Sequence, residues 1–334
     1  MRIMRKRHLF YKTLIILVSF IGALCMSLAL GAADISLKSI WLSLTTNGSS
    51  ETANMLHEIR IPRVIGAMFV GAALSVAGAI MQGLTRNPLA DPGLLGLTAG
   101  ANLALAIGLA FFPALNYFSM MVACFIGAGL GAGLVFGIGA TKRAGFSPFR
   151  IVLAGAAITA FLTAIADAIG IYFKLSKDIS MWTAGGLIGT TWSQLQIIVP
   201  IILVGVIVAT LFSRQLTILS LHEEVAIGLG QNIMKVKVIL FILIIVLTGS
   251  AVALAGNMVF LGLMIPHIVR AIVGTDYRVI LPISAITGAG FMMLADLMGR
   301  TIHAPYETPV AAIVAFLGLP FFLIVVHKGG KAFS

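Results

Sequence analysis

Few residues in this chain have the types and spacing needed for acid–base, nucleophilic or metal chemistry. The six histidines are scattered over different segments, and the two cysteines, Cys25 and Cys124, lie far apart inside apolar runs. Neither set has the spacing of a metal-binding motif. The one Gly–Lys pair that could end a phosphate-binding loop, at Lys331, is followed by Ala332 where such a loop needs Ser or Thr. The sequence therefore predicts that the chain is not an enzyme and holds no cofactor or metal of its own.

Charged residues inside apolar runs are the other candidates, because a charge in a membrane is costly and usually functional. Asp296 and Arg300 are four residues apart, so a helix places them on one face, where we expect an ion pair. Asp167 lies in a separate apolar run, and we expect it to face a wet interior. A carrier driven by protons would more often have an acid near the middle of the membrane.

The elements that must position these side chains are long apolar runs. Hydrophobic residues make up 60% of the 334 positions and charged residues 10%, whereas soluble domains have about 25% charged residues. This composition excludes a soluble enzyme and a disordered chain. Because the runs are continuous rather than alternating, a transmembrane β-barrel is also disfavoured.

We predict an all-α polytopic membrane protein with about ten transmembrane helices, each of about 20 residues, in a single transmembrane domain over residues 1–334. Only Ala255, Gly256 and Asn257 separate the seventh and eighth runs, so one long kinked helix is the alternative there. The predicted spans cover about residues 9–31, 64–82, 94–112, 118–140, 151–173, 195–213, 238–255, 258–273, 279–299 and 308–327.

Basic residues predict the orientation of these helices. The net charge of +11 would suggest nucleic acid as the partner of a soluble protein, but nearly all charges here lie between apolar runs. With ten spans, sixteen of the 22 Lys and Arg residues fall on one side, which places both termini in the cytoplasm. The first apolar run exceeds the ~7–15 residues of a signal peptide, so we expect a retained helix. The other six basic residues are Lys38, Arg60, Arg63, Lys174, Lys177 and Arg300.

Three segments are polar or rich in Pro and Gly where the topology needs only a short connector. The first starts with Arg60-Ile-Pro-Arg63 and continues through GAALSVAGAIMQ and NPLADPG to Ala101. The second is LHEEVAIGLG, ending at Gly230, and the third is GNMVFLGLMIPHIVR, ending at Arg270 and followed by TDYR. In this order, and over essentially the whole chain, they resemble the FecCD family of ABC importer permeases, which includes siderophore, haem and vitamin B12 permeases.

The resemblance implies a multi-pass, all-helical permease of the type II ABC importer kind in the cytoplasmic (inner) membrane. The implied partners are a second permease subunit, identical or paralogous, two cytoplasmic ATPases that bind ATP and Mg, an external substrate-binding protein and the lipid bilayer, with no nucleic acid. The expected cargo is an iron(III)–siderophore complex moving into the cytoplasm, with cobalamin or haem as alternatives. A secondary transporter driven by an ion gradient is the alternative from a different class. We expect a pathway lined by small and apolar residues of the fifth and neighbouring spans.

The cytoplasmic loop 214–237 is too long for a simple turn and resembles the coupling loop of ABC permeases. That loop has a short helix, a glycine turn and another short stretch, and docking of the helix in an ATPase would let closure of the ATPases move the attached spans. An ordinary solvated loop is the alternative. The expected coupling residues are Glu223, Glu224, Val225, Ala226, Gly228 and Gly230.

By the same resemblance, Arg60, Arg63 and Arg300 are expected to dock the binding protein through bidentate pairs with its carboxylates. Snorkelling of a helix-end arginine is the alternative for each, and Asp296 competes for Arg300. The NPLADPG segment is expected to be a rigid cytoplasmic connector, because proline restricts the backbone. The stretch before the fifth span occupies the position of the family's inner gate. The expected gate and connector residues are Ser147, Pro148, Phe149, Asn87, Pro88 and Pro92.

Overall fold

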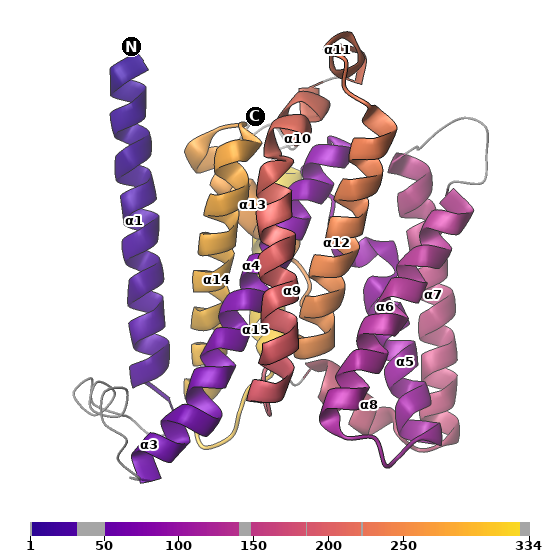
Figure 1. Cartoon of the computed structure of the whole chain (residues 1–334). Helices are drawn as coiled ribbons and strands as arrows, with labels where there is room; N and C mark the ends of the chain where they lie inside the picture. Colours follow the sequence, from indigo (N-terminus) through magenta and orange to yellow (C-terminus); the bar gives the residue numbers. More distant parts are fainter. Residues whose placement is uncertain (1, 32–50, 140–147, 185, 222, 328–334) are drawn as a thin grey trace.

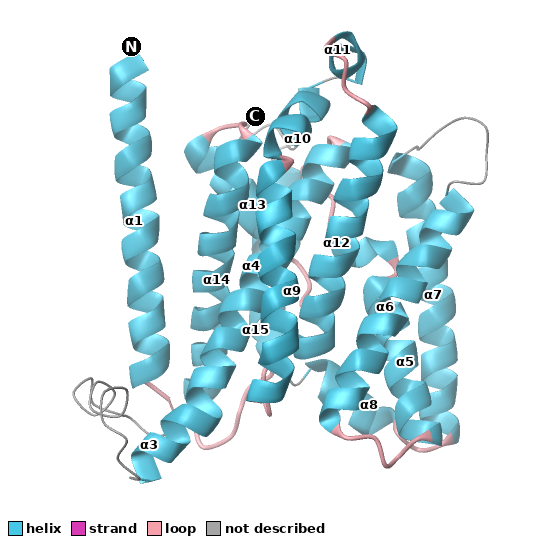
Figure 2. Ribbon diagram, viewed as in Figure 1, coloured by secondary structure: helices cyan, strands magenta, loops and turns pink. Residues whose placement is uncertain are grey.

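The regular structure of the chain is all helical, as Figures 1 and 2 show. The computed structural model describes residues 2–31, 51–139, 148–184, 186–221 and 223–327. Within these ranges no residue is in a strand, so the predicted all-α class is confirmed.

A helix stands at the position of each of the ten predicted spans. Eight are long and apolar enough to cross a membrane, whereas α5 and α13 have only 15 and 13 residues. The ten helices are α1 (Arg2–Ala29), α4 (Ile61–Thr85), α5 (Leu97–Phe111), α6 (Tyr117–Gly139), α7 (Pro148–Tyr172), α9 (Trp192–Leu211), α12 (Ile233–Ala255), α13 (Leu261–Val273), α14 (Tyr277–Thr301) and α15 (Val310–His327).

Short helices cap the two ends of this bundle. In Figure 1, α10 and α11 lie at the end where α1 begins, and α3 and α8 lie at the opposite end. We call these the α11 end and the α8 end. The short elements are α3 (Glu51–Met55), the π-helix η1 (Leu56–Arg60), the 3-10 helix η2 (Pro92–Leu95), α8 (Ser176–Ala184), α10 (Ser213–Leu221) and α11 (Glu223–Gly228).

Helix α4 is at the centre and runs obliquely through the bundle (Figure 1). It packs against α14, α12, α13 and α9, and most of its residues are buried. Glycine permits the closest of these contacts. A Cβ at Gly71 would overlap with the backbone of Gly288 in α14, and one at Gly78 would overlap with the backbone of Gly262 in α13. Without a hydrophobic driving force between helices in lipid, such close backbone packing is one of the forces that hold the bundle together.

Helices α5, α6 and α7 form a second group beside α12 (Figure 1). At Gly127 of α6, an added Cβ would overlap with the backbone of Gly100 in α5, and at Gly131 with that of Gly96 just before α5, so glycine again sets the helix separation. At Gly133, two residues further along α6, nothing lies within 4 Å of such an atom.

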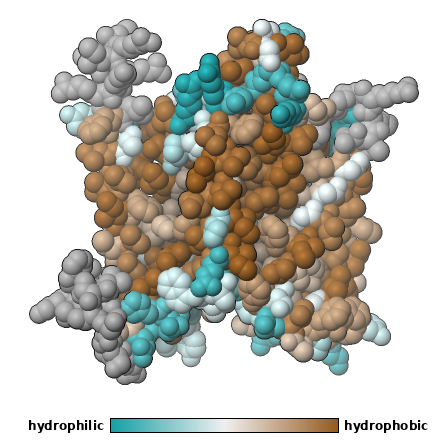
Figure 3. Space-filling view, viewed as in Figure 1, coloured by the Kyte–Doolittle hydropathy of each residue, from teal (hydrophilic) through white to brown (hydrophobic). Residues whose placement is uncertain are grey.

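The outward surface has the pattern of a membrane protein. Figure 3 shows hydrophobic side chains over the middle of the visible face and hydrophilic ones gathered at both ends. Helix α1 contributes exposed apolar side chains such as Phe10 and Ile15, each 65% exposed. This distribution fits an apolar solvent around the middle and water at the ends.

The seventh and eighth predicted spans are separate helices, so the alternative of one kinked helix is wrong. Helix α12 ends at Ala255 and α13 begins at Leu261, three residues later than the predicted start at 258. The segment between them leaves the helical conformation, with φ of +72° at Gly256 and +68° at Phe260. Left-handed backbone is unusual for a residue other than glycine, and at Phe260 it marks a locally strained turn.

Candidate functional site

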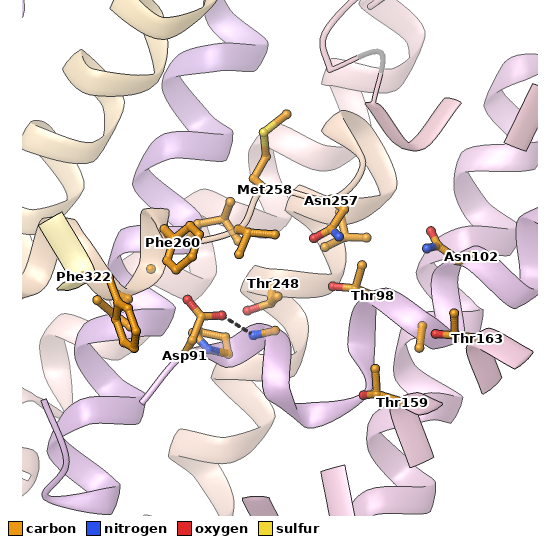
Figure 4. A pocket seen from close by; sticks show the side chains of 18 of the residues that line it. Asp91, Thr98, Asn102, Thr159, Thr163, Thr248, Asn257, Met258, Phe260 and Phe322 are labelled. Atoms are coloured by element: carbon orange, nitrogen blue, oxygen red, sulfur yellow. Dashed lines mark hydrogen bonds between the residues drawn. The ribbon is translucent and has the colours of Figure 1, made fainter. Parts of the chain in front are cut away.

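A cavity of about 570 Å³ lies where this break in the backbone meets α5, α7, α12 and α15 (Figure 4). Its volume is in the range of about 300–1,000 Å³ that ligand sites usually have. Residues 257–260, which join α12 to α13, form one wall, and Pro92 and Gly93 of the connector between α4 and α5 form part of another. Irregular backbone at membrane depth is tolerated where it lines such a cavity.

The cavity wall contains polar as well as small and apolar residues, and the expected lining of the transport pathway stays a prediction. Two hydroxyl groups of the wall, those of Thr159 on α7 and Thr248 on α12, are buried and make no hydrogen bond among the described residues. Buried hydroxyls almost always have a hydrogen-bond partner, so we expect a ligand or water in the cavity to be the partner of these two. The polar residues of the wall are Asp91, Thr98, Asn102, Thr159, Thr163, Thr248 and Asn257.

These polar residues are not among the sites predicted from the sequence, although the sequence contains a pattern that points to some of them. Thr98 and Asn102 are four residues apart on α5, and Thr159 and Thr163 are four apart on α7. Polar residues with this spacing inside an apolar run share one helix face, which points to a wet surface. The fifth predicted span, α7, does contribute to the cavity.

Asp91 carries the only carboxylate among the described residues that line the cavity. Its Oδ1 accepts a hydrogen bond of 2.7 Å from the Gly93 N–H and so caps η2. In Figure 4 the other carboxylate oxygen points toward Phe260 across the cavity. Burial raises the pKa of the Asp91 carboxyl to about 6, although the Gly93 N–H acts in the opposite direction.

The NPLADPG connector is partly buried against the helices of the bundle. Asn87 is exposed, and its side-chain oxygen accepts a 3.0 Å hydrogen bond from the Leu89 N–H. Pro92, by contrast, is buried, and η2 packs against α4, α7 and α12. Two prolines and the Asp91 cap turn the chain back toward the helices, and the rigid cytoplasmic connector expected from the sequence stays a prediction. Pro88 lies at the partly exposed start of this turn.

The predicted gate before the fifth span lies at the limit of the described chain. Ser147 is outside the described residues, and Pro148 and Phe149 begin α7 but their side chains are also outside the description. The gate assignment of these three residues stays a prediction.

The three predicted docking arginines lie near the α8 end, and all are buried, with 6–7% exposure. Arg63 donates from Nε to both carboxylate oxygens of Asp296 at 2.9 and 3.2 Å, and from Nη1 to Glu307 at 2.7 Å. Arg300 lies 3.1 Å from Asp296 through Nε, which confirms the expected i,i+4 ion pair. Arg60 donates to the Leu28 carbonyl oxygen at 2.8 Å.

We call Arg63, Asp296, Arg300 and Glu307 the ion cluster. It joins α4, α14 and the turn before α15, and Arg300 also reaches the Ser27 carbonyl oxygen of α1 at 3.2 Å. Burial of its arginines is not evident from the sequence, because Asp296 and Glu307 are 233 and 244 residues away from Arg63. Contact of these arginines with a binding protein stays a prediction.

The predicted coupling loop folds as two short helices at the α11 end. Helix α11 ends at Gly228, and Gly230 has a left-handed φ of +73°, so the expected short helix and glycine turn are present. Ala226 is fully buried, whereas Val225, Ile227 and Leu229 are 44–66% exposed. Glu224 is exposed, and the side chain of Glu223 lies outside the description. Apolar side chains clustered on an exposed turn are typical of a contact with another protein.

Comparison with known proteins agrees with this architecture. The profile of the FecCD transport family matches residues 16–328. The chain is 43% identical over 323 residues to the iron(3+)-hydroxamate import system permease protein FhuB of Bacillus subtilis (strain 168), covering 95% of this chain and 84% of that protein. It is 39% identical over 327 residues to the hemin transport system permease protein HmuU of Yersinia pestis, covering 94% of this chain and 96% of that protein.

A solved structure has the same fold. It is a metal-chelate type ABC transporter in an inward-facing conformation, with a TM-score of 0.82 and 25% sequence identity, and the match covers 97% of this chain and 99% of that one. The chain is thus a multi-pass membrane subunit of an ABC importer, which implies ATPase and binding-protein partners, and it is not itself catalytic. Family and fold together identify the chain as a member of the FecCD family of ABC transporter permeases.

Proposed function

We propose that this permease moves iron(III)–siderophore complexes from an external binding protein into the cytoplasm through the cavity described above. The observation that carries the proposal is a cavity of about 570 Å³ whose wall has buried hydroxyls, on Thr159 and Thr248, that make no hydrogen bond within the described part of the chain. Such groups can replace part of the hydration shell of a polar chelate, while the apolar remainder of the wall holds it weakly enough to leave.

The names of relatives support an iron chelate as the cargo. FhuB is an iron(3+)-hydroxamate permease, and the Fe(3+)-citrate import system permease protein YfmD of the same organism is 39% identical over 317 residues. The likeness to HmuU, a hemin permease, favours haem as the second candidate.

We further propose that the α11 end faces the cytoplasm. The first residue of α1, the coupling loop and the last residues of α15 all lie at this end in Figure 1, as an even number of spans requires. The bias in basic residues supports the same orientation. The assembly proposed has two permease subunits, identical or paralogous, and two ATPases in the cytoplasm.

The coupling loop is proposed to bind the ATPase through Glu224 and the exposed apolar side chains of α11. Glu224→Ala should abolish copurification of the ATPase with the permease. Glu58→Ala is the matched control, because Glu58 is also exposed but lies in η1, near the α8 end. Equal ATPase recovery with both variants would refute the coupling assignment.

The cargo is tested by uptake of iron-55 on defined hydroxamate, catecholate and citrate chelates, alongside haem and labelled cobalamin. Cells with and without this gene are compared. Loss of uptake of one or more iron(III) siderophores supports the proposal, whereas loss of haem or cobalamin uptake alone overturns the cargo and leaves the permease assignment intact. Collapse of the ion gradient with ATP maintained should leave uptake unchanged, and a loss would favour a secondary transporter.

For the docking arginines, we propose that the binding protein meets the α8 end beside the ion cluster. Glu307 is its most accessible member, with a side chain 35% exposed. A carboxylate of the binding protein could replace Glu307 as the partner of Arg63. Glu307→Gln would then tighten binding of the binding protein to the permease, and weaker or unchanged binding would contradict this arrangement.

A further inference from the structure

Two sequence motifs that the proposed function leaves without a role meet inside the structure. Gln82 ends the motif GAALSVAGAIMQ on α4, and Arg270 ends the motif GLMIPHIVR on α13. Their side chains are in contact, with Arg270 Nη2 donating to Gln82 Oε1 at 3.2 Å. The same Nη2 donates to the Tyr277 hydroxyl of α14 at 2.9 Å.

We propose that Thr217, Tyr277, Arg270 and Gln82 form a hydrogen-bonded relay that transmits movement of the coupling helices to the wall of the cavity. The proposal rests on the coupling role assigned above to α10 and α11. It assigns positioning roles to the four residues; none of them contacts cargo.

The relay begins on α10, directly before α11. Thr217 Oγ1 accepts a hydrogen bond of 3.0 Å from the Tyr277 backbone N–H, and it lies 3.3 Å from the Asp276 carboxylate that caps α14. It also donates to the Ser213 carbonyl oxygen at 2.8 Å, so its orientation is fixed by its own helix. A shift of α10 therefore acts directly on the first turn of α14.

The middle of the relay is tightly packed. The Tyr277 ring is buried, and the Arg270 guanidinium lies 5.8 Å from its centroid in addition to the hydrogen bond to its hydroxyl. A Cβ at Gly83 would come within 2.8 Å of the Tyr277 ring and of the Leu216 side chain of α10. Glycine at position 83 thus lets α4, α10 and α14 meet at one point.

The far end of the relay reaches the cavity through the carbonyl oxygens of Gly262 and Leu263, the first of which is affected by a proline. Pro266 has no N–H, so the Gly262 carbonyl oxygen lacks its usual helical partner. Gln82 Nε2 donates to the Leu263 carbonyl oxygen at 3.0 Å and lies 3.5 Å from that of Gly262. Gly262 and Leu263 both line the cavity.

The side-chain amide of Gln82 therefore connects the start of α13 to Arg270. Its amide nitrogen donates to the Leu263 carbonyl oxygen and lies near the Gly262 carbonyl oxygen that lacks its helical partner. Its amide oxygen accepts from Arg270, which is linked to Tyr277 of α14. Every step between residues in the relay from Thr217 to Leu263 is a hydrogen bond. A proline turn held by one side chain can change position more easily than a regular helix turn, because fewer backbone hydrogen bonds hold it.

The test uses the complex of the permease with its ATPase in lipid vesicles, and its readout needs no cargo. Thr163→Cys places a thiol on the cavity wall in a background with Cys25→Ser and Cys124→Ala. The rate of maleimide labelling is measured with and without vanadate-trapped ATP. We expect trapping to change this rate strongly in the otherwise unaltered complex.

Thr217→Val and Gln82→Leu each remove polar contacts at one end of the relay. Each should reduce the change in labelling rate caused by vanadate trapping by about tenfold, the effect expected for loss of a hydrogen bond in a network with a charged group. ATPase copurification and ATP hydrolysis should stay near normal. Thr217→Ser keeps the hydroxyl and should behave as the unaltered complex. Tyr277→Phe should act like Gln82→Leu, with Tyr306→Phe as control because Tyr306 is 71% exposed.

The combined Thr217→Val and Gln82→Leu variant decides whether the four residues act as one unit. A relay predicts that the second substitution adds little to the first, whereas two independent structural defects would add. An unchanged response to trapping in the single variants, or additive losses in the double variant, overturns the proposal. Loss of ATPase copurification would instead contradict the coupling assignment. A failure of siderophore uptake would contradict only the proposed cargo.

Discussion

Replacing Asp296 by Asn is the sharpest perturbation of the ion cluster, because this carboxylate is fully buried and holds two arginines. It accepts from Arg63 Nε at 2.9 and 3.2 Å and lies 3.1 Å from Arg300 Nε. Asn has nearly the same shape but no charge. The substitution therefore leaves two buried guanidiniums with less compensation and changes little else.

The size of the effect follows from what the arginines retain. Breaking a buried ion pair by removing one partner costs about 3–5 kcal/mol. Arg63 keeps Glu307 at 2.7 Å, and Arg300 keeps the Ser27 carbonyl oxygen at 3.2 Å, so the loss should lie near the lower limit. At about 2 °C per kcal/mol for a large chain, about 3 kcal/mol corresponds to a fall of roughly 6 °C in melting temperature.

The assay is thermal unfolding of the purified permease in detergent. Asp167→Asn is the matched control, because Asp167 is exposed on α7 and has no place in the cluster. Adding Arg300→Gln to Asp296→Asn should recover part of the loss, since it removes the buried guanidinium that has lost its carboxylate partner. Melting temperatures for Asp296→Asn and Asp167→Asn within 2 °C of each other, or a further fall in the double variant, would refute the reasoning.

Two further predictions concern the helix contacts and the cavity. Gly78→Ala should prevent α4 and α13 from packing and abolish folded protein on size-exclusion chromatography, whereas Gly133→Ala should be tolerated because its Cβ would meet nothing within 4 Å. Since the Asp91 pKa is raised from 3.8 to about 6, the charged and disfavoured form appears as the pH rises through this range. The melting temperature of the wild type should therefore fall between about pH 4 and pH 6 relative to that of Asp91→Asn, which stays neutral and keeps an acceptor for the Gly93 N–H; parallel pH profiles would contradict this.

The apolar runs predict the fold well, because membrane helices must satisfy their own backbone hydrogen bonds within each span. The errors lie where the backbone departs from that rule. Helix α13 begins at Leu261 and not at 258 because residues 257–260 line a cavity, and hydropathy alone does not distinguish a cavity wall from a helix. The motif NPLADPG has the same ambiguity, since its prolines predict a rigid turn but not that Pro92 is buried.

The candidate sites were predictable only where the signal is local. The ion pair between Asp296 and Arg300 follows from their spacing of four, but the contact of Arg63 with Asp296 depends on the packing of α4 against α14. The contact of Arg270 with Gln82 likewise joins residues 188 positions apart. Without information on which spans are neighbours, such pairs cannot be found from one sequence.

Helices α4 and α14 are joined at three levels, and this limits where the molecule can change shape. The Arg63–Asp296 pair joins them near the α8 end, the Gly71–Gly288 contact joins them in the middle, and Tyr277 packs against Gly83 near the α11 end. A pair held in this way moves as one body, because separating it would break an ion pair and a close backbone contact together.

Three segments between helices connect this pair to the rest of the bundle. Residues 86–96 connect α4 to α5, and residues 274–276 connect α13 to α14. Residues 256–260 connect α12 to α13. Two of these segments, 86–96 and 256–260, also supply cavity walls. We therefore expect force applied to α10 to move the α4–α14 pair as a unit, with the change in shape concentrated in the two irregular segments that form part of the cavity wall.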